Sequence, residues 1–197
     1  MNYIFFGRSC DLNIGNGKTV SAIRLLMHEH LILGKTVFSN IKLNGIEYTP
    51  FTPDNIGEIL ETENAFVLFD EIHAIIPKND RILPGCKKHP KLGLCYDLVQ
   101  MFRQVRKNDI TTASTAQTFG DCVYQLRVVM QQMIICEKFH IEKGVFRKCE
   151  TDKCPPEHGN HFIKQTNYRT GEILYFEPEM FYKFYNSNEI VKGWNKL

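Results

Sequence analysis

The sequence lacks any apolar run of about 18 residues or more, so no membrane-spanning helix is predicted. It also lacks a strong charge of either sign, because the formal net charge is only +2, which does not by itself indicate a nucleic-acid binder. The first residues lack the basic region, apolar run and cleavage site of a signal peptide, so we do not expect a signal peptide. No internal repeat or low-complexity tract is present. A chain of 197 residues with these properties predicts one compact domain.

Cysteine is plentiful, and the seven residues are an odd number. Without a secretory signal we do not expect a disulfide framework, and metal binding or core filling are the two interpretations. Two cysteines and two histidines fall within a short stretch: Cys149, Cys154, His158 and His161. Two thiolates and two imidazoles are a ligand set that tetrahedral zinc takes, so a structural Zn²⁺ site is predicted here, with a polar turn as the alternative.

The order of apolar segments alternates between strand and helix, which predicts an α/β fold with a central, mostly parallel sheet. The expected strands are 2–7, 36–41, 65–70, 110–116 and 133–139. The expected helices are 18–33, a short one after Pro53, 95–107 and 121–132. Residues 77–94 are expected to form a long loop. Turn signals and aromatic-rich segments follow, so we expect a core of residues 1–139 and a β-rich C-terminal appendage, 140–197, of the same domain.

The stretch GNGKT, residues 15–19, stands between the first strand and the first helix. Glycines allow backbone amides to approach phosphate oxygens, and a helix N-terminus favours negative charge there. Lys18 would carry the charge for the outer phosphates and Thr19 would bind Mg²⁺. The full motif has a glycine where this chain has Leu12. The predicted nucleotide-binding residues are Asn13, Ile14, Gly15, Asn16, Gly17, Lys18 and Thr19.

Two further elements follow expected strand ends. Asp70 and Glu71 end the run FVLFDE, where one carboxylate can hold the magnesium shell and the next can orient the attacking water. Gln117 ends the strand 110–116 and is well placed to respond to the terminal phosphate. The alternatives without a function are a polar strand end for Asp70 and Glu71 and an exposed loop residue for Gln117. Together with the phosphate loop, these residues predict ATP hydrolysis with Mg²⁺ as cofactor.

The strings GNGKT, FSNIKL, FVLFDEIH, MFRQVRKNDITTASTAQ and VYQLRVVM resemble the FtsK–HerA superfamily of DNA-pumping ATPases. Within it the chain is similar to viral genome-packaging ATPases, such as those of the Sulfolobus turreted icosahedral viruses, and more distantly to Zot-like proteins. The resemblance assigns Asn40 to the position after the second strand and Gln117 to the end of the fourth. It assigns the family's basic residues to Arg103, Arg106 and Arg127, one of which would be an arginine finger, acting in cis or in trans.

The resemblance implies a RecA-like P-loop NTPase domain that translocates double-stranded DNA, with packaging of a viral genome into a capsid as the expected function. It further implies a homo-oligomeric ring (pentamer or hexamer), capsid or vertex proteins as partners, and a location in the host cytoplasm or in association with the virion. Two alternatives stay open: another P-loop motor ATPase, of helicase or secretion type, and a non-enzymatic, zinc-stabilised nucleic-acid-binding protein. Zot-like proteins carry a membrane-spanning segment, which this sequence does not predict.

Basic residues gather in the expected loop. Such a cluster suits sequence-independent contacts with a phosphate backbone, although lysines that keep a surface loop soluble are an equal alternative. The predicted DNA-binding residues are Lys78, Arg81, Lys87, Lys88 and Lys91.

Overall fold

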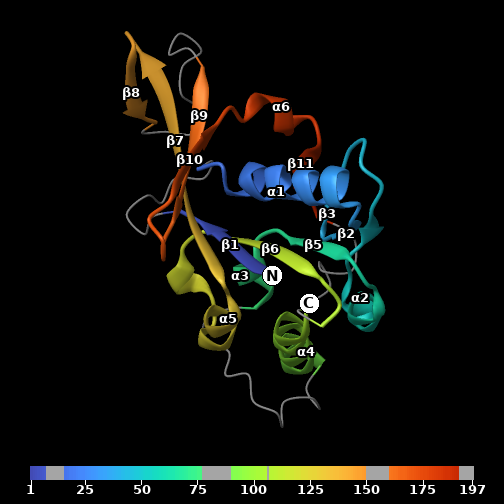
Figure 1. Cartoon of the computed structure of the whole chain (residues 1–197). Helices are drawn as coiled ribbons and strands as arrows, with labels where there is room; N and C mark the ends of the chain where they lie inside the picture. Colours follow the sequence, from blue (N-terminus) through green and yellow to red (C-terminus); the bar gives the residue numbers. More distant parts are fainter. Residues whose placement is uncertain (8–15, 77–89, 106, 150–159, 191–197) are drawn as a thin grey trace.

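A computed structural model of the chain describes residues 1–7, 16–76, 90–105, 107–149 and 160–190 (Figure 1). One twisted sheet separates two helical layers. Helix α1 (Lys18–Leu33) covers one face, and the shorter helices α2 to α5 cover the other. The mixed α/β architecture with a mostly parallel central sheet confirms the predicted fold class.

The main sheet has the strand order β10-β9-β7-β1-β6-β5-β2-β4, with β8 paired to β7. The strands from β7 to β4 are parallel, whereas β8, β9 and β10 are antiparallel to their neighbours. Their bounds are β1 (Asn2–Phe6), β2 (Thr36–Ser39), β4 (Thr49–Pro50), β5 (Ala65–Phe69), β6 (Thr111–Ala116), β7 (Gln132–Glu142), β8 (Val145–Lys148), β9 (His161–Asn167) and β10 (Ile173–Phe176). The five predicted strands are therefore present.

Helix α1 has the limits that its sequence predicts. Gly17 at its start and Gly34 at its end both adopt the left-handed conformation, with φ of 80° and 68°. The Gly34 and Lys35 amides donate to the carbonyls of the last turn, which closes the helix in the manner of a glycine cap. Its buried face, which includes Ile23 and Leu26, lies against the sheet.

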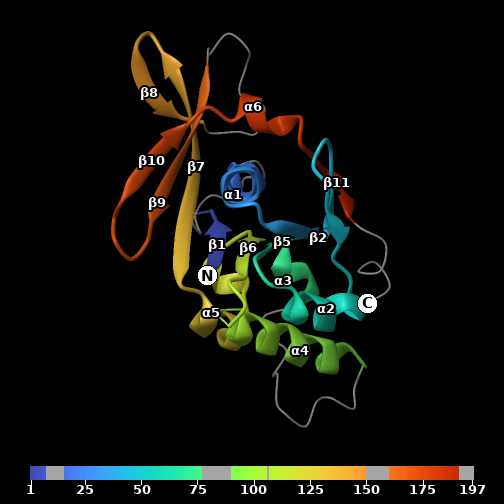
Figure 2. The same ribbon diagram turned by 45° about the vertical axis from the view of Figure 1, so that its right-hand side comes forward.

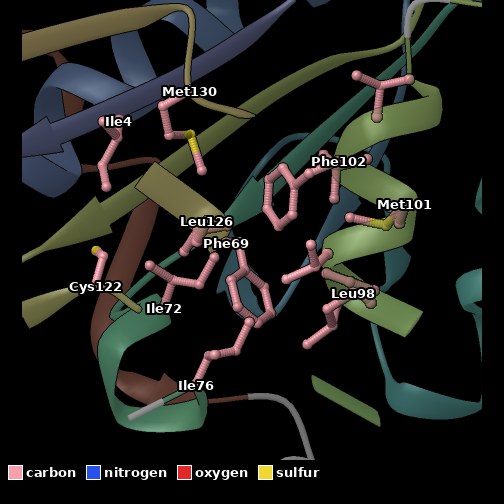
Figure 3. Packing of buried hydrophobic residues seen from close by; sticks show 14 of the residues in the cluster. Ile4, Phe69, Ile72, Ile76, Leu98, Met101, Phe102, Cys122, Leu126 and Met130 are labelled. Atoms are coloured by element: carbon pink, nitrogen blue, oxygen red, sulfur yellow. The ribbon is translucent and has the colours of Figure 1, made fainter. Parts of the chain in front are cut away.

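The strands divide their apolar side chains between two cores, because successive residues point to opposite faces. On β5, Phe66 and Leu68 join the cluster under α1, whereas Val67 and Phe69 face α4 and α5. Figure 3 shows Phe69 of this second cluster surrounded by side chains from β1, α3, α4 and α5. Burial on both faces explains why this strand is a continuous apolar run.

Several element limits differ from the prediction. The second strand breaks at Asn40 into β2 and β3 (Ile41–Leu43), and α3 (Ile72–Ile75) was not predicted. Helix α4 (Pro90–Gln104) begins inside the expected loop, because proline fits the first turn of a helix. Helix α5 (Tyr124–Val129) is shorter than expected, and α2 (Ile56–Glu61) follows a 3₁₀ turn, Pro53–Asn55. A second such turn, Phe119–Asp121, precedes α5.

The C-terminal part is β-rich, as predicted, and it extends the main sheet through β9 and β10. The short helix α6 (Glu179–Tyr182) then packs against α1, and β11 (Tyr185–Ile190) pairs antiparallel with β3 (Figure 2). The chain thus passes over α1 before it ends. The division into a core and an appendage stays a prediction. Among the described residues, no helix is both long and apolar enough to cross a membrane.

Candidate functional site

Two predicted site residues, Asp70 and Gln117, lie at the carboxyl edge of the parallel strands, together with Gly7. Gly7 follows β1, Asp70 follows β5 and Gln117 follows β6, so the parallel pairing brings all three to one edge. The Gly7 amide donates to the Gln117 carbonyl at 3.0 Å. A Cβ on Gly7 would lie only 2.8 Å from Asn16 Nδ2, so glycine permits this close packing. Residues 8–15, including the predicted Asn13, Ile14 and Gly15, lie outside the described residues.

The Asp70 carboxylate is at the centre of this edge and is 4% exposed. Its Oδ1 accepts hydrogen bonds from Thr19 Oγ1 at 2.9 Å and from Thr115 Oγ1 at 2.7 Å. Thr19 belongs to the first turn of α1, whereas Thr115 belongs to β6. Three elements that are distant in sequence therefore meet on one oxygen atom.

Asn40 fixes the backbone at the same point. Its Nδ2 donates to the Asp70 carbonyl at 2.9 Å, and its Oδ1 accepts from the Asp70 amide at 2.7 Å. The amide is fully buried. The Asn40 amide also donates to the Leu68 carbonyl at 3.3 Å, so Asn40 is bonded to β5 and to Asp70 at the point where β2 ends. The position that the resemblance assigned to Asn40 thus has a structural role beside Asp70.

Glu71 differs from Asp70 in every respect that matters for chemistry. Its side chain is exposed, and its backbone is left-handed, with φ of 54° and ψ of 45°. This conformation is uncommon for a residue with a Cβ and carries strain. The Glu71 amide donates to Thr115 Oγ1 at 2.8 Å. Thr115 therefore holds both acidic residues, one by its carboxylate and the other by its backbone.

The electrostatics of the cluster make Asp70 a receptor for positive charge. Burial raises the pKa of Asp70, while the hydrogen bonds from Thr115 and Thr19 and the charge of Lys18 lower it. Burial is the largest of these effects, so the hydrogen bonds and the Lys18 charge do not fully offset the loss of water around the negative carboxylate. A cation beside Thr19 and Asp70 would supply it.

Arg103, one of the two predicted arginines within the described ranges, lies away from this edge. Arg103 is exposed near the end of α4, and the carbonyl of its neighbour Phe102 accepts from Asn2 Nδ2 at 2.7 Å. Asn2 is the first residue of β1, so Arg103 lies at the opposite edge, about 13 Å away along the strand. Arg127 on α5 is partly buried, with its guanidinium 5.8 Å from the Tyr124 ring centre. Arg106 lies outside the described residues.

The other predicted sites fall largely outside the described residues. These include Lys78, Arg81, Lys87, Lys88, Cys154 and His158, and Lys91 is described only as part of the backbone of α4. Cys149 is buried with its Sγ 3.3 Å from His140 Nδ1, and His140 pairs across the strands with His161. Within the described ranges no three metal-ligating side chains are grouped to hold an ion, so the zinc site stays a prediction.

Thr115 is the functional residue that the sequence did not reveal. Residues 111–116 read TTASTA, and all six are buried. Nothing local distinguishes one hydroxyl of this strand from another. Only its position near the carboxyl end of the strand, one residue before Ala116 and two before Gln117, was a usable signal, because that edge is where ligands bind in open α/β sheets.

Comparisons with known proteins support the fold. The N-terminal domain of zonular occludens toxin from Neisseria meningitidis matches with a TM-score of 0.50 and 15% identity, over 100% of this chain and 97% of that chain. The genome packaging NTPase B204 from Sulfolobus turreted icosahedral virus 2, in complex with ATP-gammaS, matches with a TM-score of 0.50 and 8% identity, over 89% of this chain and 96% of that chain. No family model and no curated protein sequence matches. The chain therefore shares its mixed α/β fold with these two proteins, one of them a genome packaging NTPase.

Proposed function

We propose that this chain is an ATPase that converts hydrolysis into the translocation of double-stranded DNA, in the packaging of a viral genome into a capsid. The observation that carries the proposal is the cluster of Thr19, Asp70 and Thr115 beside the exposed Glu71. The fold shared with a packaging NTPase supports the same assignment.

In this proposal the stretch 13–19 holds the phosphates, with Lys18 on the outer ones. Thr19 and Asp70 would hold Mg²⁺, which would supply charge compensation for the phosphates. The donor set fits the ion, because a hydroxyl and a carboxylate oxygen are ligands that Mg²⁺ takes, and Thr19 Oγ1 and Asp70 Oδ1 lie side by side, hydrogen-bonded at 2.9 Å. Glu71 then orients and deprotonates the attacking water, and Gln117 responds to the terminal phosphate.

The substitution Glu71→Gln tests the chemical step. It removes the base but keeps the size of the side chain and its hydrogen-bonded amide. We expect ATP binding to be retained and kcat to fall about 100-fold or more. Lys18→Ala should instead weaken nucleotide binding. Near-normal turnover by Glu71→Gln would place the base elsewhere.

DNA as the substrate rests on the basic loop and is tested separately. Double-stranded DNA should stimulate the ATPase. Lys87→Ala with Lys88→Ala should weaken binding of all duplexes alike and reduce its salt dependence. Substitution of two exposed lysines outside the loop, Lys107 and Lys143, is the matched control. Unchanged affinity and salt dependence in the loop variant would return these lysines to a role in solubility.

Another P-loop motor is the second candidate. It is favoured by the mutual coverage of this chain and the zonular occludens toxin domain, 100% and 97%. The two functions differ in their response to DNA. If the ATPase rate is unchanged by DNA and Glu71→Gln is inactive, the chain would be an ATPase motor that acts on a substrate other than DNA.

A further inference from the structure

The C-terminal strands contact the start of α1 at Gly17. This residue has φ of 80°, and an added Cβ would lie 2.3 Å from Ile163 Cδ1 and 2.8 Å from Ile163 Cγ1. Ile163 belongs to β9 and is fully buried. Two features therefore require glycine at position 17: the left-handed backbone and the lack of space for a side chain beside Ile163.

This contact is one of a series along one side of α1. Cys136 of β7 donates from Sγ to Ser21 Oγ at 3.4 Å. Arg24 has its guanidinium 5.3 Å from the centre of the Phe176 ring on β10. The three positions on the helix, 17, 21 and 24, are spaced by one and two turns and therefore share a face. Neighbouring strands of the sheet, β7, β9 and β10, each contact one of them.

Ile163 is held firmly on its own side. It pairs with Lys138 on β7 and with Phe176 on β10, so β9 is bonded along both edges at this point. In Figure 2, where α1 is seen along its axis, these strands stand beside the helix. A side chain on a strand with two partners is a rigid support for a glycine that, alone, has wide conformational freedom.

We propose that Ile163 is a positioning residue for the phosphate loop. By packing on Gly17 it fixes the left-handed turn that directs the first amides of α1, and with them Lys18 and Thr19, at the phosphates. The inference rests on the proposed nucleotide-binding function of this edge. Ile163 belongs to β9, whereas Asp70 and Glu71 follow β5, and three strands of the sheet (β7, β1 and β6) stand between β9 and β5. Its effect should therefore fall on binding and not on the chemical step.

Graded truncation tests this role. Ile163→Val removes Cδ1, the atom nearest to Gly17, and Ile163→Ala removes the whole contact. We expect the Kd of a fluorescent ATP analogue and the KM for ATP to rise about threefold and about tenfold, with kcat within about twofold of the wild type. Ile59→Ala is the matched control, because Ile59 is fully buried in α2 on the other face of the sheet.

Hydrogen exchange provides a readout that does not require nucleotide. The Ser21 amide donates to the Gly17 carbonyl at 2.9 Å, and its exchange should accelerate in Ile163→Val and Ile163→Ala but not in Ile59→Ala. Unchanged Kd and unchanged Ser21 exchange in the folded Ile163→Val protein would overturn the proposal, and so would an equal effect of Ile59→Ala. A wild-type protein that binds no nucleotide would overturn the proposed function instead, and the exchange measurement would still decide whether Ile163 fixes Gly17.

Discussion

Removal of the Thr115 hydroxyl is the sharpest test of the acidic cluster. Thr115→Val replaces Oγ1 by a methyl group of similar size, so the packing of β6 changes little. Two hydrogen bonds disappear: the one donated to Asp70 Oδ1 at 2.7 Å and the one accepted from the Glu71 amide at 2.8 Å. The side chain is 1% exposed, so water does not replace them readily.

The magnitude follows from these two bonds. A hydrogen bond to a carboxylate contributes about 1.5–3 kcal/mol, and an amide left without a partner costs about 1–3 kcal/mol. Burial of the added methyl group offsets about 0.8 kcal/mol. We therefore expect the free energy of unfolding to fall by about 2–5 kcal/mol, which lowers Tm by about 4–20 °C for a domain of this size. The released Glu71 backbone leaves its strained conformation, and kcat should fall about 10- to 100-fold.

Thr112→Val provides the control on the same strand. Thr112 is fully buried and donates to Asn2 Oδ1 at 2.8 Å, but it lies about 10 Å from Thr115, towards the opposite edge. Calorimetry and ATPase kinetics should show a loss of about 1–2 kcal/mol in stability with kcat and KM unchanged. A wild-type kcat in folded Thr115→Val would falsify the role of Thr115 in positioning Asp70 and Glu71. An equal loss of kcat in Thr112→Val would show that the effect is general destabilisation of the protein.

Three further predictions concern separate parts of the molecule. Burial raises the pKa of Asp70 in the folded protein, so the contribution of Asp70 to stability falls as the pH rises from its unfolded-state pKa to its folded-state pKa. Asp70→Asn should therefore raise the Tm of the nucleotide-free protein by about 2–5 °C at neutral pH and abolish the stabilisation by Mg²⁺ with ATP. A lower Tm for Asp70→Asn would contradict the expected direction. If Arg103 serves the nucleotide of a neighbouring subunit, mixing inactive Arg103→Ala with inactive Lys18→Ala should restore part of the ATPase rate, whereas mixed oligomers without activity would exclude the shared site. Protein purified without chelators should contain about one zinc per chain, with Cys149→Ser and His161→Ala lowering it; less than about a tenth of an equivalent would leave these residues as a polar turn.

The elements that the sequence predicted are those with a local signature. Helix α1 has an apolar face and glycines at both limits, and β5 has an apolar run that ends in Asp70 and Glu71. Because the chain order of parallel strands and helices restricts how they pack, these features also placed Thr19, Asp70 and Gln117 at one edge. The strand break at Asn40 was not predicted, and the side-chain hydrogen bonds of this residue go to Asp70, a partner thirty positions away.

The features that the sequence did not reveal depend on pairing between distant segments. Thr115 is one hydroxyl among several on β6, and only the register with β5, in which Phe69 faces Ser114, brings it to Asp70. Ile163 is an ordinary apolar residue of a short strand, and its contact with Gly17 depends on β9 joining β7. Helix α3 is a single turn, too short for a periodic signal.

The distribution of positive charge around the cluster bears on how a complete site would be assembled. Phosphoryl transfer spreads negative charge over the equatorial oxygens, and an arginine that reaches them accelerates the reaction by stabilising that charge. Lys18 is at the carboxyl edge, but Arg103 is at the opposite edge, about 13 Å away along β1. Under the proposed function, Arg103 would therefore serve a nucleotide when its edge faces the carboxyl edge of another copy. Such a contact joins two different surfaces, and its repetition gives a closed ring or an open filament. Under the proposed function, assembly and hydrolysis would then depend on the same surface, and a variant that prevents assembly should lose ATPase activity even with Thr19, Asp70 and Glu71 intact.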